Sequence, residues 1–584
     1  MEKRRSRPAL AVLLALLLTA LTACTELPTS GSVDPVENLE PTCRGCLNVD
    51  PVGPRPGDDP KTIVDGFLQA MASYEPTYAT ARKYLTEQAA QSWNPDQGTT
   101  IYRGQLAATS PTSIVLDGQM VGTLDPFRNY NARVQRIRQP FGLIKEAGQW
   151  RINRPPPGLF VPEATFNTFY DPYNLYFIGR DGTLVPDPIY LPQQANISSA
   201  LVVALLNGPS SWLKPVVRTA FPINTTLNVQ SVTVTPELNA EVQLSDAVNQ
   251  LNDQARAEMA AQVAYTLRQA QIRAVRFLVN GEIYRVPGAD AATGLISVTD
   301  DQVLKKAAIP TRASDQLFAA SGHGVDTLGA GGKPARVDGP LGGRRGIDRV
   351  AVSVNGRDLA AVTNDRTALR RQLDGGDSVT LIRNASDLLR PQFSRQNELW
   401  AVGMKDGRQH IWVADGDRVI EVDAPSVIRD KIVAFRLSPD GSRMALIREV
   451  GSSRQLGMVR IKRWEGKITI DGWRALDTDA NQGASSITQF RDVGWHDDSH
   501  LVVIGSAGPQ SPVGVYTVAQ DASEINVLGE LSGSDAADAV EIATSPAHNQ
   551  VALLTRDGAA YQLDAATSWR RIGDQTFSAL AYPG

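Results

Sequence analysis

Three cysteines are the residues of this 584-residue chain whose type and spacing point most directly to chemistry. Cys24 follows a basic head and an apolar run at residues 9–18, which is too short to span a bilayer but suits a secretory signal. The residues just before Cys24 are small or aliphatic, as a cleavage site requires. The pattern predicts that residues 1–23 are a signal peptide and that the Cys24 thiol then carries a diacylglycerol. An ordinary secretory signal and an uncleaved signal anchor are the alternatives.

The other two cysteines, Cys43 and Cys46, lie within residues 24–57, a stretch rich in proline and glycine with few apolar residues. Such a segment cannot bury enough surface to offset chain entropy, so a flexible tether is predicted. A redox C-x-x-C motif would need a strand before it, and a zinc site would need two further ligands. A small disulfide between Cys43 and Cys46, formed in an oxidising compartment, is the favoured interpretation.

Other motifs of catalysis and metal binding are missing from the sequence. It contains no G-x-S-x-G elbow, no P-loop and no H-E-x-x-H pattern. The only histidine cluster is His496-Asp497-Asp498-Ser499-His500, which falls in an expected turn between two strands, where polar residues are usual. We therefore expect no enzyme activity, no cofactor and no metal site.

The charge of the chain bears on its partners. The formal net charge is −4, and removal of residues 1–23 takes away four basic residues and one acid, which leaves about −7. A mildly acidic chain without a basic run is a poor binder of nucleic acid or of anionic lipid. No second apolar run approaches a transmembrane length. Membrane attachment is therefore expected through the lipid on Cys24 alone, on the extracytoplasmic face of the cell membrane.

The first folded unit is expected over residues 58–163. Asp59-Pro60 predicts the start of a helix, and apolar residues recur at helical spacing between residues 63 and 71. A short second helix and an antiparallel sheet follow, with strands expected at residues 113–116, 119–122, 131–137 and 141–144 and a last one around Trp150. Helices followed by a curved sheet that ends in this way resemble the NTF2-like cone fold, an α+β domain. No pair of acids stands out inside it.

The second unit is expected over residues 164–305, in the order β-α-β-β-α-β. Its strands are predicted at residues 174–178, 229–234, 240–244 and 275–279, and its helices at residues 197–206 and 253–270, the second capped by Asp253. Leu205-Leu206-Asn207-Gly208-Pro209 and Phe277-Leu278-Val279-Asn280-Gly281 resemble motifs of the GerMN domain. The resemblance implies an extracytoplasmic α+β binding module without catalytic residues.

Residues 306–584 repeat internally and predict an all-β propeller after a short linker. A strand, tight turn and strand recur around Ser353, Ser394, Ser438, Trp495 and Ser545, with spacings of 41, 44, 57 and 50 residues. This period suits four-stranded blades. Strands at residues 317–320 and 324–328 are expected to complete the final blade and close a ring of five or six blades. The Ser438-Pro439-Asp440-Gly441 turn resembles that of TolB-like propellers.

The order of signal, tether, cone-like domain, GerMN domain and propeller resembles the actinobacterial LpqB lipoprotein family. Cys24-Thr25-Glu26-Leu27-Pro28-Thr29-Ser30-Gly31 fits the start of that family. The resemblance implies a partner, the extracytoplasmic part of the MtrB sensor histidine kinase, and a role in cell-envelope and division signalling. It supplies no role for Cys43 and Cys46.

Two other functions stay open on the sequence. One is an envelope module that binds peptidoglycan or another glycan, which exposed aromatic side chains on the GerMN or propeller surface would favour. The other is a hydrolase that uses a propeller pocket, although the sequence shows no pattern of nucleophile and base.

Overall fold

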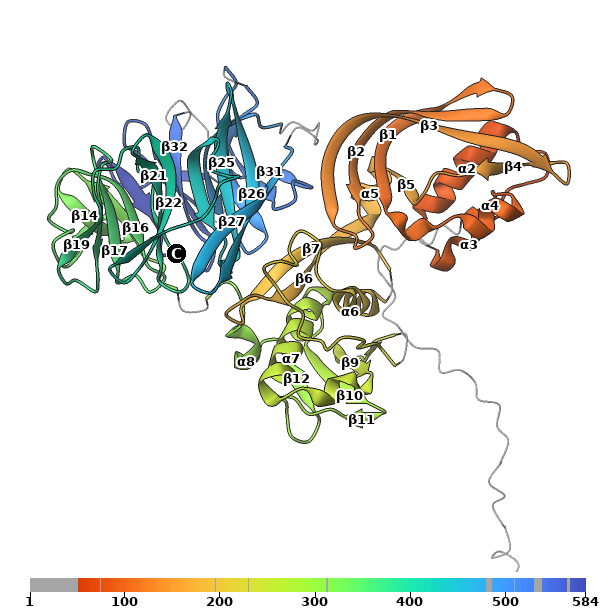
Figure 1. The fold of residues 1–584 in the computed structure, drawn as a ribbon, viewed down its shortest axis with the longest axis horizontal. Coiled ribbons are helices and arrows are strands. Elements are labelled where there is room, and N and C mark those ends of the chain that lie inside the picture. Colours follow the sequence, from red (N-terminus) through yellow and green to blue (C-terminus); the bar gives the residue numbers. More distant parts are fainter. Residues whose placement is uncertain are drawn as a thin grey trace, which may run out of the picture. The chain divides into compact units, whose positions relative to one another are not determined.

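The structure is a computed structural model that describes residues 51–584 apart from 74, 195, 229–230, 311–312, 479–485, 509, 530–537 and 565–567 (Figure 1). All described residues belong to one unit of the chain by their contacts. The predicted signal peptide, Cys24, Cys43 and Cys46 lie outside the described residues. Within them, no helix is both long and apolar enough to cross a membrane.

The first domain opens with the predicted helix, α2 (Pro60–Ala72). The Asp59 side chain caps it by accepting a hydrogen bond from the Thr62 N–H at 2.8 Å. The apolar stripe of α2 is buried, including Ile63, Phe67 and Met71, so the predicted helical spacing is confirmed. Two short helices follow, α3 (Ala79–Arg82) and α4 (Glu87–Ser92).

Replacing Asp59 with alanine tests this cap. We expect the free energy of unfolding to fall by about 1 kcal/mol, because the first turn of α2 loses the acceptor for an otherwise unpaired N–H. Asp65→Ala, an exposed position in the same helix, is the matched control and is expected to change it by less than about 0.5 kcal/mol. Urea unfolding of both variants checks the difference, and equal losses would contradict the assigned cap.

A curved five-stranded sheet packs against α2, in the order β4-β3-β2-β1-β5 (Figure 1). All neighbours are antiparallel except β1 and β5, which run parallel. The strands are β1 (Thr99–Ser110), β2 (Ser113–Leu124), β3 (Tyr130–Glu146), β4 (Gln149–Arg154) and β5 (Leu159–Pro162).

The strand predictions for this sheet were partly wrong. The pairs of short strands predicted at residues 113–122 and 131–144 are two continuous strands, β2 and β3, and β1 was not predicted. Gly118, which falls between the two predicted strands, lies opposite Gly104 in the ladder between β1 and β2. A Cβ atom at Gly118 would lie 2.1 Å from the Arg103 carbonyl oxygen, so this glycine permits a close approach of two strands instead of ending one.

The second domain has the predicted order of elements, but its first hairpin is not part of the main sheet. Strand β6 forms a two-stranded sheet with β7, whereas β8 to β12 form a separate sheet in which β9 and β10 run parallel. Asn252, not Asp253, caps the long helix, because its side chain accepts a hydrogen bond from the Ala255 N–H at 2.9 Å. The elements are α5 (Glu163–Phe169), β6 (Tyr170–Ile178), β7 (Leu184–Pro192), α6 (Ile197–Asn207), β8 (Thr233–Val234), β9 (Asn239–Leu244), α7 (Asp253–Leu267), β10 (Ala274–Val279), β11 (Glu282–Ile283), β12 (Leu295–Ser297) and α8 (Asp301–Leu304).

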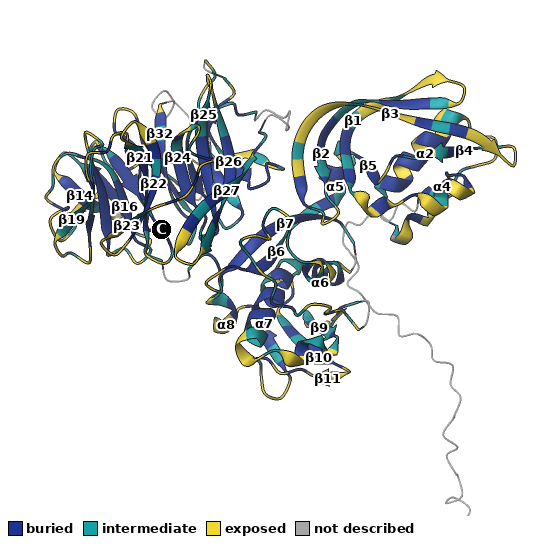
Figure 2. Cartoon of the chain, in the orientation of Figure 1, coloured by how far each residue is buried: buried dark blue, intermediate teal, exposed yellow. Residues whose placement is uncertain are grey.

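The described residues from 317 onward form six four-stranded antiparallel sheets. The predicted ring closure is confirmed, since β36 (Ala579–Ala581), near the end of the chain, pairs with β13 (Leu317–Ser321). β14 (Gly324–Leu328) and β15 (Pro334–Arg336) complete that sheet. Figure 2 shows the strands buried along most of their length and the connecting loops exposed.

The other five sheets follow the chain in order. Two are β16 (Ile347–Val352), β17 (Leu359–Thr363), β18 (Leu369–Gln372) with β19 (Ser378–Ile382), and β20 (Gln392–Phe393), β21 (Leu399–Lys405), β22 (Arg408–Asp415) with β23 (Arg418–Glu421). Three are β24 (Lys431–Leu437), β25 (Arg443–Val450), β26 (Ser453–Trp464) with β27 (Lys467–Ala475), then β28 (Gln489–Trp495), β29 (His500–Ser506), β30 (Gly514–Ala519) with β31 (Ile525–Val527), and β32 (Ala539–Ser545), β33 (Gln550–Thr555), β34 (Ala560–Leu563) with β35 (Trp569–Arg571).

Candidate functional site

The histidine cluster singled out in the sequence lies in the turn between β28 and β29, as expected. Within the described part of the chain, no group of three or more His, Cys, Asp or Glu side chains is arranged to hold a metal ion. The turn does gather a hydroxyl, an imidazole and a carboxylate, from Ser499, His500 and Asp497. The Ser499 Oγ and the Asp497 carboxylate both contact Nδ1 of His500, at 3.2 and 2.9 Å. A catalytic triad needs the serine at Nε2 and the acid at Nδ1, so this geometry is not that of a triad.

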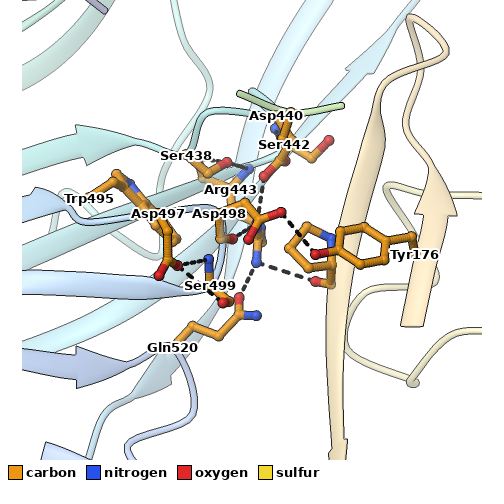
Figure 3. Close-up of polar contacts among 12 residues, drawn as sticks. Tyr176, Ser438, Asp440, Ser442, Arg443, Trp495, Asp497, Asp498, Ser499 and Gln520 are labelled. Atoms are coloured by element: carbon orange, nitrogen blue, oxygen red, sulfur yellow. Dashed lines mark hydrogen bonds and ion pairs between the residues drawn. The ribbon is translucent and has the colours of Figure 1, made fainter. Parts of the chain in front are cut away.

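Instead, this turn joins the propeller to the second domain. The Tyr176 hydroxyl, from β6, donates a hydrogen bond to Oδ2 of Asp498 at 3.1 Å (Figure 3). Arg443 lies beside it with a side chain only 1% exposed, and its Nη2 contacts Oδ2 of Asp440 at 2.5 Å and the Asp498 carbonyl oxygen at 3.1 Å. Nη1 contacts Gln520, and the guanidinium also lies 5.3 Å from the centre of the Trp495 ring. A buried polar network therefore connects the two domains.

The pKa values of the two acids in this turn are shifted in opposite directions. Desolvation, aided by the charge of Asp497, raises the pKa of Asp498 to about 6, although the Tyr176 hydrogen bond and Arg443 oppose this. Burial also acts to raise the pKa of Asp497, but the hydrogen bond and charge of His500 outweigh it and lower that pKa to about 2. The same pairing with Asp497 outweighs burial at His500 and raises the pKa of that imidazole. Near neutral pH the two adjacent carboxyls therefore differ in how readily they take up a proton.

Further contacts join the same two domains. The Trp212 indole N–H donates to the Gly472 carbonyl at 2.7 Å, and Nη1 of Arg460 donates to the Trp212 carbonyl at 2.8 Å. Nη2 of Arg395 donates to the Lys305 carbonyl of the second domain at 3.3 Å, and its Nη1 donates to the carbonyls of the adjoining linker residues Ala307 and Ala308 at 2.6 Å each. Like Asp498, the propeller residue Arg395 follows the end of a first strand of its sheet. The second domain thus bonds to the turns after β20 and β28 and, through Trp212, to β26 and β27.

The first strands of the sheets surround the centre of the propeller. β28 contacts β24 and β32, and β36 contacts β16 and β32. Where these strands end, a pocket of about 100 Å³ is lined by residues of all six sheets and by the linker residues Ile309, Pro310 and Ala313. Where they begin, a second pocket of about 290 Å³ has a strongly charged lining. Arg390 and Arg436 line both pockets, so they lie between them.

A layer of charged side chains separates the two pockets. Five consecutive sheets each contribute one residue from the same part of the repeat, namely Arg349, Arg390, Arg436, Asp492 and Glu541. Nη2 of Arg390 donates to Oδ2 of Asp492 at 2.8 Å, and its Nη1 lies 3.5 Å from Oε1 of Glu541. Nε of Arg349 also lies 3.5 Å from the Glu541 carboxylate. The layer is a network of buried ion pairs across the centre of the propeller.

Comparisons with known proteins agree with this architecture along the chain. Residues 53–167 match the family model of the lipoprotein LpqB N-terminal domain, residues 174–285 that of sporulation and spore germination, and residues 329–579 that of the lipoprotein LpqB β-propeller domain. Lipoprotein LpqB of Cutibacterium acnes is 28% identical over 97% of this chain and 98% of that protein. Lipoprotein LpqB of Streptomyces coelicolor is 27% identical over 99% and 98%. The chain belongs to the LpqB lipoprotein family.

Among solved structures, the first GerMN domain of the Bacillus subtilis sporulation protein GerM is 23% identical, with a TM-score of 0.18, over 22% of this chain and 96% of that one. Membership of the LpqB family makes the chain a lipid-anchored, membrane-associated protein. Cys24 as the lipid acceptor and the Cys43–Cys46 disulfide stay predictions, because these residues lie outside the described part of the chain.

The charged layer of the propeller was not predicted from the sequence. A signal was available, because a charged residue precedes each of the repeat anchors Ser353, Ser394, Ser438, Trp495 and Ser545 by two to four positions. β-Bulges interrupt the alternation of side chains in four of the first strands. They lie between residues 347 and 349, 432 and 434, 490 and 492, and 539 and 541. A bulge changes which side chains face the centre, so simple alternation along the strand does not show the layer.

Proposed function

We propose that this LpqB-family protein is a non-catalytic binding protein, held at the extracytoplasmic face of the cell membrane by a lipid on Cys24. Its proposed partner is the extracytoplasmic part of an MtrB-like sensor histidine kinase, whose envelope and division signalling it regulates. The observation that carries the binding role is the propeller centre, where two pockets open at opposite ends of the same ring of strands. The identity of the partner rests on the family resemblance.

Crosslinking in intact cells tests this proposal. A photo-crosslinking amino acid replaces Lys431, which lines the charged pocket with a side chain 56% exposed. The matched control carries the same amino acid at Arg136, an exposed position of the first domain (82% exposed). Mass spectrometry is expected to identify a sensor kinase ectodomain in the Lys431 sample but not in the Arg136 sample. Cys24→Ala, which removes the lipid acceptor, is expected to abolish its recovery.

Recovery of the kinase in equal amount from both positions, or from the Cys24→Ala variant, would count against the proposal. A second candidate function, glycan binding, is favoured by one observation: the side chain of Trp464 at the end of β26 is 75% exposed. Aromatic faces of this kind present a large apolar surface to ligands. Crosslinked material that contains cell-wall glycan and no kinase would favour this second candidate.

A further inference from the structure

The charged pocket of the propeller has more positive than negative residues in its lining. Seven basic residues and four acidic residues line its volume of about 290 Å³. Six of the seven basic residues are arginines, whose planar guanidinium groups stay charged and match carboxylate geometry. The excess of positive charge suits an anionic ligand.

The arginines at the base of this pocket are not all paired. Arg390 is held by Asp492 and Glu541, but Arg436 has no comparable partner. Nη1 of Arg436 donates to the Phe435 carbonyl at 2.5 Å, whereas its Nη2 lies 3.9 Å from Oδ1 of Asp492 and makes no hydrogen bond within the described part of the chain. Arg436 is only 9% exposed. A buried donor without an acceptor is costly, and a ligand oxygen would relieve that cost.

A second arginine, Arg491, lies in the lining next to Asp492. Its Nη1 donates to the Ala539 carbonyl at 2.9 Å, and among the described residues no carboxylate pairs with it. Burial lowers the pKa of Arg491, and the repulsion of Arg556 and Arg454 adds to this against the attraction of Asp538. Negative charge in the pocket would favour both Arg436 and Arg491.

We infer that this pocket binds the carboxylates of an acidic peptide segment presented by a partner protein. The charged layer itself shows the chemistry, because Asp492 and Glu541 already serve as carboxylate partners of Arg390. An incoming glutamate or aspartate would extend the same pairing to Nη2 of Arg436 and to Arg491. The bulges before Arg349, Asp492 and Glu541 direct these side chains toward the centre.

This pocket is also free of the contact with the second domain. Of the propeller residues that bond to the second domain, Arg395 and Asp498 follow the ends of first strands, and Arg460 and Gly472 lie on β26 and β27. The lining of the charged pocket includes none of these four residues. A partner segment therefore reaches the charged pocket without displacing that domain. The inference rests on the proposed binding function and adds the chemistry by which the partner is recognised.

Titration of the full mature chain with two capped peptides tests the inference. One is Gly-Glu-Glu-Gly-Glu-Gly, and the other has glutamine in place of each glutamate, so the two differ in charge and hardly in size. Calorimetry is expected to show binding of the first only, and binding that weakens as salt is added. Arg436→Met is expected to weaken it by roughly tenfold or more, because a charge-assisted pair is lost in a buried site.

Two further variants distinguish a specific loss of peptide binding from misfolding of Arg436→Met. Lys431→Gln changes an exposed residue of the lining and is expected to weaken binding by about two- to fivefold, while Arg136→Gln, in the first domain, is expected to leave it unchanged. The inference would be overturned by equal binding of the two peptides, or by binding of inorganic phosphate but not of the acidic peptide. Full binding of the acidic peptide by both Arg436→Met and Lys431→Gln would also overturn it. If the peptide fails to bind while crosslinking recovers the kinase, the inference fails and the proposed function stands. If the peptide binds and no kinase is recovered, the inference stands and the proposed kinase partner fails.

Discussion

Replacing Arg443 with methionine is expected to lower the free energy of unfolding by about 3–5 kcal/mol, because it leaves a buried charge without its partner. The Asp440 side chain is fully buried (0% exposed), and Arg443 is the cation that pairs with it at 2.5 Å. The same guanidinium also donates to the Asp498 carbonyl and, at 3.4 Å, to the Pro186 carbonyl of the second domain. Its loss therefore weakens both the turn after β24 and the junction between the domains.

Urea unfolding followed by tryptophan fluorescence measures this loss, since the Trp495 ring lies against the Arg443 guanidinium. Arg136→Met is the matched control: Arg136 pairs with Asp117 on the surface, and such a pair contributes at most about 1 kcal/mol. The double variant Asp440→Asn with Arg443→Met is expected to recover part of the loss, because no buried charge is then orphaned. A loss of less than about 1 kcal/mol in Arg443→Met would contradict the importance of the pair.

The sequence was informative wherever structure depends on neighbours along the chain. The helix after Asp59 was predicted because its cap and apolar stripe lie within one dozen residues. The strand repeat, the Ser438-Pro439-Asp440-Gly441 turn and the closure of the ring by strands near residues 317–328 were predicted from patterns that recur along the chain, although the partner strand β36 was not. Such features rest on propensity and periodicity, which a sequence carries directly.

The junction could not be predicted, because its partners are distant along the chain. Tyr176 and Asp498 are 322 residues apart, and Arg443 and Pro186 are 257 residues apart. From the sequence, Asp498 was a polar residue in an exposed turn, and nothing local indicates that a second domain buries it. Only tertiary packing turns an ordinary turn aspartate into a partly buried carboxyl with a perturbed pKa.

The partly buried carboxyl of Asp498 gives a second large effect on stability, which depends on pH. Its pKa is about 6 in the folded chain, against an ordinary value of 3.8. The folded state thus binds the proton more tightly than the unfolded state, so this group destabilises the fold above pH 6, and the penalty disappears as the pH falls from 6 to below 4. The difference between these two pKa values corresponds to up to about 3 kcal/mol.

Asp498→Asn removes the ionisable group and keeps an oxygen that accepts the Tyr176 hydrogen bond. We expect the variant to be more stable than the parent by up to about 3 kcal/mol at pH 7.5 and by only about 1 kcal/mol at pH 4.5, because the penalty shrinks as the pH approaches the ordinary pKa of 3.8. The raised pKa of His500 also favours the fold at low pH and the lowered pKa of His496 opposes it, but both residues are present in parent and variant. Subtracting the two unfolding curves therefore isolates Asp498.

Asp497→Asn is the control, because it changes the adjacent carboxyl, which is similar in chemistry but opposite in effect. The pKa of Asp497 is lowered to about 2, so its charged form stabilises the fold throughout the range from pH 4.5 to 7.5. Its neutralisation is expected to destabilise the protein at both pH values, through loss of the His500 pair. If Asp498→Asn also destabilised the protein at pH 7.5, the Asp498 carboxylate would be a favourable partner of Arg443 and Tyr176, and burial would not be the dominant influence on its pKa.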